Sequence, residues 1–170
     1  MNNKLSKKIE LLANLSIIAV ALLLGGVVVK RFIFTPRPAE AQGGIQVGTK
    51  VSLQDVNWSA SDKNLVLVLQ KGCHFCAESG PFYQRLVRET SGRGDVHLIA
   101  ALPQDVKEAG QYLSDMGAPI GEVRQASPSS LGAPGTPTLL LVDHTGAVSA
   151  VWIGKLSPEK EAEVLRRLES

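Results

Sequence analysis

The sequence has few of the residues that build a metal site or a nucleic-acid interface. It contains only two cysteines and three histidines, and a structural zinc site needs four ligands. The formal net charge is +2, so the chain as a whole lacks the strongly basic footprint of a nucleic-acid-binding protein. The sequence also shows no internal repeat and no low-complexity tract. We therefore expect no metal, no other cofactor and no nucleic-acid partner.

Charged residues are absent from residues 11–29, which read "LLANLSIIAVALLLGGVVV". A helix rises about 1.5 Å per residue, so a run of this length matches a hydrocarbon core of about 30 Å. Lys7 and Lys8 precede the run, and Lys30 and Arg31 follow it. This pattern predicts one uncleaved transmembrane helix in contact with the lipid bilayer.

Two alternatives to this anchor remain open. The small residues of "AEA" at 39–41 resemble the cleavage site of a signal peptide. That site, however, lies well beyond the apolar run, with Lys30 and Arg31 in between. The other alternative is a buried core helix, which usually shows a polar stripe.

The orientation of the anchor follows from a nearly balanced count of basic residues. Three of them, Lys4, Lys7 and Lys8, precede the run, and Lys30, Arg31 and Arg37 follow it. The amino terminus tips this balance towards an inside N-terminus. Residues 1–34 are then a cytoplasmic stub and transmembrane anchor in the cell membrane, and the folded domain is extracytoplasmic, on the periplasmic side.

Proline and glycine separate the anchor from a domain with its own core. Residues 35–44 have Pro36 and Pro38 near their start and Gly43 and Gly44 at their end, a composition typical of a tether. Residues 45–170 are enough for a hydrophobic core. They predict strands at 65–69, 96–102, 138–142 and 147–153, and helices at 73–90, 105–116 and 158–168.

These elements define an α/β fold. A strand or hairpin is expected within 45–58, and a short strand around Val123. Strand–helix–strand units favour parallel pairing, and the hairpin with its turn at 143–146 adds antiparallel strands. We therefore expect a mixed β-sheet with helices on both faces.

The two cysteines form the motif "CHFC" directly after the first buried strand, where a helix begins. A disulfide between Cys73 and Cys76 would close a very small loop and stabilise little. A zinc site lacks ligands, because His97 and His144 are scattered through the sequence. A redox role explains the placement better, because a helix N-terminus favours a thiolate. Cys73 is then the attacking thiol and Cys76 the resolving thiol.

The two residues between the cysteines are candidates for redox tuning. A protonated His74 beside Cys73 would stabilise the thiolate further. Phe75 would shield Cys76 or offer an apolar contact to a partner. The alternatives are an exposed histidine without a specific role and simple packing of Phe75.

At these residues the chain resembles the thioredoxin-like superfamily, and more narrowly the membrane-anchored TlpA/ResA-type thiol-disulfide oxidoreductases. Besides the cysteine pair, the resemblance rests on Pro81 and on "GTPT" at 135–138. It implies that Pro81 kinks the active-site helix and that Pro137 is a cis-proline facing the cysteines. Thr136 and Pro137 would then bind substrate peptides through main-chain hydrogen bonds.

The chain departs from the resembled family at two points. Gly72 stands where the family usually has an aromatic residue. The strand before the pair lacks the buried acid of thioredoxin, so proton transfer at Cys76 would rely on water, Lys71 or His74.

The resemblance implies an enzyme that reduces disulfides of envelope proteins, of the cytochrome c maturation type. Its partners would be protein disulfides or thiols and a membrane electron donor or acceptor. Two alternatives stay open: a disulfide-forming oxidant, and a thioredoxin-fold binding module with a dormant disulfide.

Overall fold

The computed structural model describes residues 44–169. Their elements are, in chain order, η2 (Trp58–Ala60), β1 (Lys63–Val68), α2 (His74–Glu78), α3 (Gly80–Thr90), β2 (Val96–Leu102), α4 (Val106–Asp115), β3 (Glu122–Gln125), η3 (Ser129–Leu131), β4 (Thr138–Asp143), β5 (Val148–Ile153) and α5 (Pro158–Glu169). The predicted anchor at 11–29 lies outside these residues, and within them no helix is long and apolar enough to cross a membrane.

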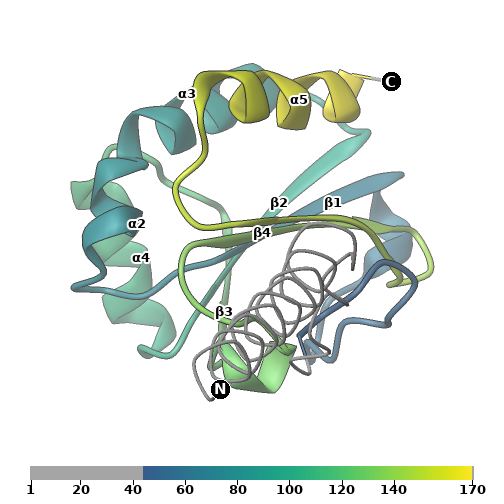
Figure 1. The fold of residues 1–170 in the computed structure, drawn as a ribbon, viewed down its shortest axis with the longest axis horizontal. Helices are drawn as coiled ribbons and strands as arrows, with labels where there is room; N and C mark the ends of the chain where they lie inside the picture. Colours follow the sequence, from purple (N-terminus) through teal and green to yellow (C-terminus); the bar gives the residue numbers. More distant parts are fainter. Residues whose placement is uncertain (1–43, 170) are drawn as a thin grey trace, which may run out of the picture. The chain divides into compact units, whose positions relative to one another are not determined.

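The strands form one mixed sheet in the order β3-β2-β1-β4-β5 (Figure 1). The pairs β1–β2 and β2–β3 are parallel, whereas β1–β4 and β4–β5 are antiparallel. The mixed sheet and the hairpin are confirmed, as is the short strand around Val123, which becomes β3. The central strand β1 is buried on both faces, and Leu65 to Val68 have no exposed surface, as expected for a continuous apolar run.

Alternate residues of the strands point into two separate cores. The first core contains Leu65, Leu67 and the buried side chains of α2, α3, α4 and α5. Figure 1 shows α3 and α5 together over this face of the sheet. The second core contains Val66 and Val68, and it is covered by parts of residues 45–58 and by residues near η3.

Helices cover both faces of the sheet, as expected, but the α-helices among residues 44–169 all lie on one face. Among residues 44–169, every α-helix buries its apolar side chains in the first core. The second core receives Trp58 of η2 and Leu131 of η3, which are short 3-10 helices. Two parallel crossovers that step in the same direction across the sheet keep their helices on the same face.

The strand or hairpin expected within 45–58 is absent from the structure. In this segment Lys50 makes a single isolated bridge to Ala147. The backbone turns at Gly48 and again at Asp55, which both adopt positive φ angles. These turns interrupt an extended path, so Val51 and Leu53 cover the second core and do not extend the sheet.

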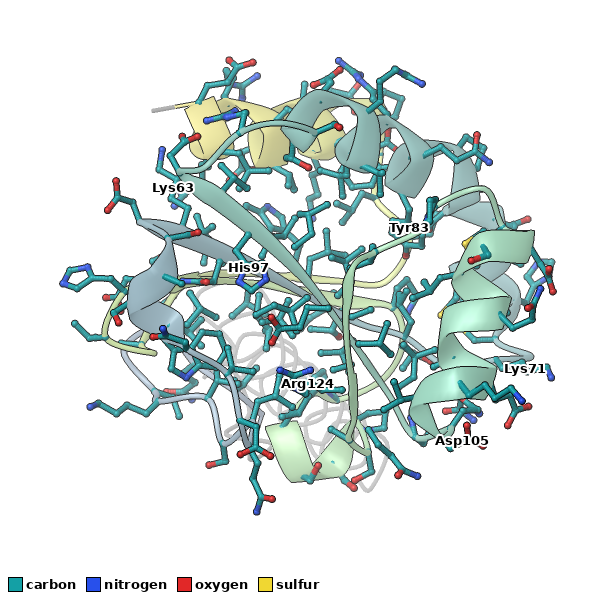
Figure 2. All side chains as sticks on the ribbon, turned by 180° about the vertical axis from the view of Figure 1, so that it is seen from behind. Lys63, Lys71, Tyr83, His97, Asp105 and Arg124 are labelled. Carbon is teal, nitrogen blue, oxygen red and sulfur yellow. The ribbon has the colours of Figure 1, made fainter. Side chains whose placement is uncertain are left out.

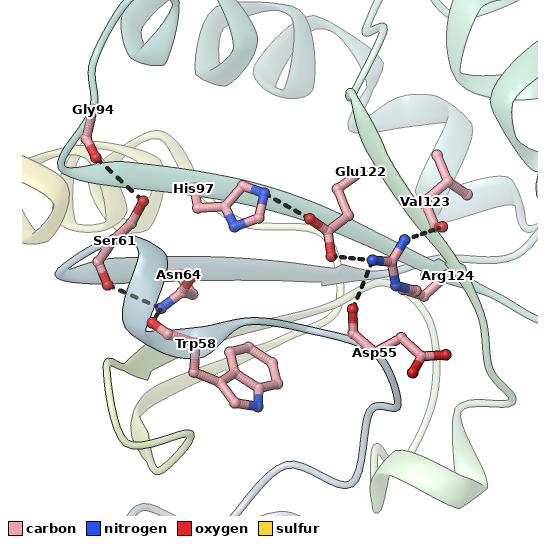
Figure 3. A network of polar contacts seen from close by, with 9 residues as sticks. All are labelled: Asp55, Trp58, Ser61, Asn64, Gly94, His97, Glu122, Val123 and Arg124. Carbon is pink, nitrogen blue, oxygen red and sulfur yellow. Dashed lines mark hydrogen bonds and ion pairs between the residues drawn. The ribbon is translucent and has the colours of Figure 1, made fainter.

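A polar network fastens the edge strand β3 to its surroundings (Figure 3). His97 Nε2 on β2 lies 3.0 Å from Glu122 Oε2, and Arg124 Nη2 lies 2.8 Å from Glu122 Oε1. Arg124 also donates to the backbone oxygen of Asp55 at 2.8 Å. The network thus joins β2, β3 and the segment before β1, on the far side of the sheet from the first core's helices.

Leu67→Ala should test the central position of β1. Removing this fully buried side chain leaves a cavity, and we expect the free energy of unfolding to fall by about 2–5 kcal/mol. Urea denaturation of the purified protein measures it. Val47→Ala is the matched control, because Val47 is 67% exposed and should change stability by less than about 0.5 kcal/mol. Equal effects of the two substitutions would contradict this packing.

Candidate functional site

The chain leaves β1 through a tight turn that presents Cys73 at the start of a helix. The Cys73 N–H donates to the carbonyl oxygen of Gln70 at 3.2 Å. Between them Gly72 adopts a φ of +83°, a conformation that strains residues with a side chain. This turn therefore explains why glycine occupies the position where the resembled family usually has an aromatic residue.

Cys73 is the N-cap residue of α2, and its sulfur is held by two contacts. The Cys76 N–H donates to Cys73 Sγ at 3.2 Å. The Cys73 thiol also contacts the backbone oxygen of Thr136 at 3.3 Å. Both cysteines are free thiols in this structure; Cys73 is partly exposed and Cys76 is fully buried. A partner can thus reach Cys73 first.

Opposing effects set the acidity of Cys73. Its partial burial alone would raise the pKa of the thiol, because burial disfavours the thiolate. Hydrogen bonds with Cys76, Thr136 and the backbone of Phe75 outweigh burial, and they leave the pKa of Cys73 below its ordinary value. A thiol with a lowered pKa supplies more of the nucleophilic thiolate near neutral pH.

Cys76 has the opposite character. Burial is the largest cause and, with the hydrogen bond to Cys73, raises the pKa of Cys76 to about 12. This thiol stays protonated while Cys73 ionises. The pair therefore contains one partly exposed thiol with a lowered pKa and one fully buried thiol with a raised pKa.

The loop before β4 completes the site. The bond between Thr136 and Pro137 is cis, as expected, and Pro137 is buried. The carbonyl oxygen of Pro137 accepts from the Gly154 N–H at 2.8 Å, whereas the Thr136 N–H donates to no group within residues 44–169. The Thr136 carbonyl oxygen therefore lies against Cys73, and the N–H of the same residue is an unused donor.

The expected continuous helix over 73–90 is two helices. The structure ends α2 at Glu78 and starts α3 at Gly80. Pro81 lies in the first turn of α3 and has no N–H to donate to the carbonyl oxygen of Ala77, four residues earlier. The position of Pro81 accounts for the break, which lies one turn beyond Cys76.

The residues between the cysteines face the surface. His74 Nε2 lies 3.2 Å from Glu78 Oε1, and the side chain is 77% exposed. Glu78 also pairs with Lys155 at 3.0 Å. Phe75 is 53% exposed. Its ring is therefore not packed in the core, and it offers an apolar surface beside Cys73.

The possible proton carriers also lie at the surface. Lys71 Nζ is 2.7 Å from Glu108 Oε1, and both side chains are about half exposed. Within residues 44–169 no carboxylate is buried, and no group of three or more candidate ligands is arranged to hold a metal ion. Cys76 thus has no buried charged neighbour in the part of the chain that the structure describes.

Two residues that the sequence analysis missed lie beside the pair. Tyr83 and Tyr112 pack in the same core as Cys76, and each hydroxyl is buried without a hydrogen-bond partner. One signal was present in the sequence, because Tyr83 follows Cys76 by two helical turns. The position of Tyr112 depends on how α4 packs and left no such signal.

Comparison with known proteins identifies the fold. No family model and no curated protein sequence matches the chain. Solved structures resemble it at low identity, among them the thioredoxin domain of a thiol-disulfide oxidoreductase from Bacteroides vulgatus. That match has a TM-score of 0.56 and 14% identity, and it covers 75% of this chain and 100% of the other.

Two further solved structures are similar to the chain to a comparable extent. A thiol-disulfide isomerase from Corynebacterium glutamicum gives a TM-score of 0.53 at 19% identity, covering 74% of this chain and 94% of its own. StoA from Bacillus subtilis gives 0.53 at 14% identity, covering 74% and 96%. The described domain therefore has the thioredoxin-like α/β fold, as predicted.

The two thiols should react in different ranges of pH. We expect iodoacetamide to modify Cys73 at lower pH than it modifies the same thiol in the unfolded chain, because hydrogen bonds lower the pKa of Cys73. Cys76 should stay unmodified at pH 10, because its pKa is about 12. Mass spectrometry of the reduced protein after timed alkylation measures both. In urea both thiols should titrate normally, and equal reactivity in the folded protein would contradict the geometry.

Proposed function

We propose that this chain is a membrane-anchored, extracytoplasmic thiol-disulfide oxidoreductase that reduces disulfides of envelope proteins. The observation that carries the proposal is the asymmetry of the pair. Cys73 is accessible and has a lowered pKa, whereas Cys76 is fully buried directly behind it. Thiol-disulfide exchange needs such an order of reaction.

The reaction has two exchanges. The Cys73 thiolate attacks one sulfur of a target disulfide, and the other target sulfur leaves with the electron pair and takes up a proton. Cys76 then attacks Cys73 Sγ, breaks the mixed disulfide and releases the second target thiol. The target gains two electrons and two protons, and the enzyme ends with a Cys73–Cys76 disulfide.

The surroundings of Cys73 favour a reductant over an oxidant. Strong oxidants of this kind stabilise their reduced form through a very acidic thiol. Here the thiolate gains hydrogen bonds but loses stability through burial. His74, the residue that could add positive charge, lies against Glu78 at 3.2 Å, and that carboxylate offsets its charge.

Substrate proteins would bind across the surface next to Cys73. The unused N–H of Thr136 is available to an extended target strand. The exposed ring of Phe75, two residues after Cys73, offers the target an apolar contact. Thr136 and Pro137 would thus hold the target, and His74 and Phe75 would tune its approach.

The family and location complete the proposal. The similarity to StoA and to other thiol-disulfide proteins supports a protein of the TlpA/ResA type. The apolar run at 11–29 would anchor it, with the domain on the periplasmic side. A membrane electron donor would then return the Cys73–Cys76 disulfide to the dithiol.

Cys76→Ser should trap the substrates. This variant can form a mixed disulfide through Cys73 but cannot resolve it, so adducts should accumulate at several times the wild-type level. Non-reducing gels followed by mass spectrometry measure them. Cys73→Ser is the matched control and should trap none. Adducts on Cys73→Ser would invert the roles, and their absence from both variants would favour a binding module.

The anchor has a separate test. We expect the full chain to stay in the membrane fraction after alkaline carbonate extraction, and a variant lacking residues 1–34 to be released. N-terminal sequencing of the mature protein reports cleavage directly. A soluble mature protein that begins after Ala41 would overturn the anchor and indicate a cleaved signal peptide.

A further inference from the structure

Both tyrosines of the chain lie in one core with the resolving cysteine. The sequence contains only two tyrosines, and Tyr83 of α3 and Tyr112 of α4 pack in the core that contains Cys76. Figure 2 shows Tyr83 directed to the inside of the molecule, whereas Lys71 lies at the outer surface near α4. Cys76 and Cys73 both act electrostatically on each of the two tyrosines, and no charged side chain is buried among residues 44–169.

The packing of α4 against the start of α3 brings Tyr112 to this place. Gly80 lies one turn after Cys76, and a side chain there would approach Met116 Cγ to 3.1 Å. Gln84 Nε2 donates to the Met116 backbone oxygen at 2.7 Å. Tyr112 is one helical turn before Met116, on the same side of α4. The glycine thus permits the close approach that seats Tyr112 beside the pair.

The two hydroxyls have no structural role within the described residues. Both oxygens are buried and neither has a hydrogen-bond partner, which destabilises a fold. The hydroxyl of Ser79, one turn before Tyr83, donates to the carbonyl oxygen of Phe75 at 2.8 Å, and its interaction with Tyr83 lowers the pKa of that tyrosine less than burial raises it. Phenylalanine would fill the same space without this penalty, and the preceding residue, Phe82, is itself buried in this core. A buried unpaired group of this kind calls for a functional reason.

The resolving step of the proposed reaction gives these hydroxyls a function, because it needs a thiolate at Cys76. Its sulfur must become a thiolate to attack the mixed disulfide, yet no carboxylate is buried among residues 44–169. The charged groups on the adjoining elements, Lys71 with Glu108 and Glu78 with Lys155 and His74, are paired at the surface. Burial raises the pKa of Tyr83 and Tyr112, so both hydroxyls stay protonated and act as donors.

We propose that Tyr83 and Tyr112 are positioning residues that stabilise the Cys76 thiolate during the resolving step. This inference rests on the proposed thiol-disulfide exchange. As Cys76 gives up its proton, the hydroxyls turn their O–H dipoles towards the sulfur. The thiolate attacks Cys73 Sγ, a new S–S bond forms, and the bond to the target breaks. The departing target sulfur takes the electron pair and then the proton.

A two-step reaction with one equivalent of 5,5′-dithiobis(2-nitrobenzoate) separates the two thiols in the reduced full chain in detergent. Attack by Cys73 releases the first coloured thiolate, and attack by Cys76 on the mixed disulfide releases the second. In Tyr83→Phe/Tyr112→Phe we expect the first phase within about twofold of wild type. The second should slow about three- to tenfold at pH 7, and its pH profile should move to higher pH. The loss of rate is moderate, because the thiolate of a less acidic thiol is also a better nucleophile.

Thr90→Val is the matched control, because it removes another buried hydroxyl from α3, one that donates to Leu86. Both phases should remain as in wild type. Urea unfolding adds a readout, since the double variant should be as stable as wild type or more stable. A second phase unchanged in the double variant, with a normal first phase, would overturn this inference alone. A wild-type protein without a fast first phase would overturn the proposed function together with it.

Discussion

The antiparallel pairing of β1 with β4 is the constraint on which the site depends. Its register sets Val68 opposite Thr138, so the turn that leaves β1 meets the loop that enters β4. Cys73 and Thr136, distant in sequence, thereby come into contact at 3.3 Å. Because β1 is buried on both faces and pairs on both edges, this junction rests on the central strand of the sheet.

The two thiols differ in acidity because they lie at different depths in the domain. The start of α2 is near enough to solvent for a partner to reach Cys73, and the N–H of Cys76 still donates to its sulfur. One turn deeper, Cys76 loses contact with water altogether. Hydrogen bonds at the start of α2 thus lower the pKa of Cys73, whereas burial raises that of Cys76. In the proposed reaction Cys73, with its lowered pKa, would attack, whereas Cys76, with its raised pKa, would need help to ionise.

Local patterns in the sequence predicted much of this arrangement. The apolar run before Cys73 and the hairpin turn at 143–146 each specify their own structure through nearby residues. What failed depends on contacts between distant segments. The cover of the second core by residues 45–58 and the approach of Tyr112 are set by tertiary packing, which leaves no periodicity to read. The cis bond at Pro137 and the position of Thr136 could be predicted only through the family resemblance.

The reduction potential of the Cys73–Cys76 pair tests the central claim most directly. Equilibration of the protein against thiol buffers of known potential, with the fraction of dithiol counted by alkylation, measures it. A value near that of thioredoxin, about −270 mV, is the expected result for a reductant recharged by a membrane donor. A value near about −120 mV would reverse the direction of electron flow. A value well below about −300 mV, with an unreactive Cys73, would contradict the account and leave a structural disulfide in its place.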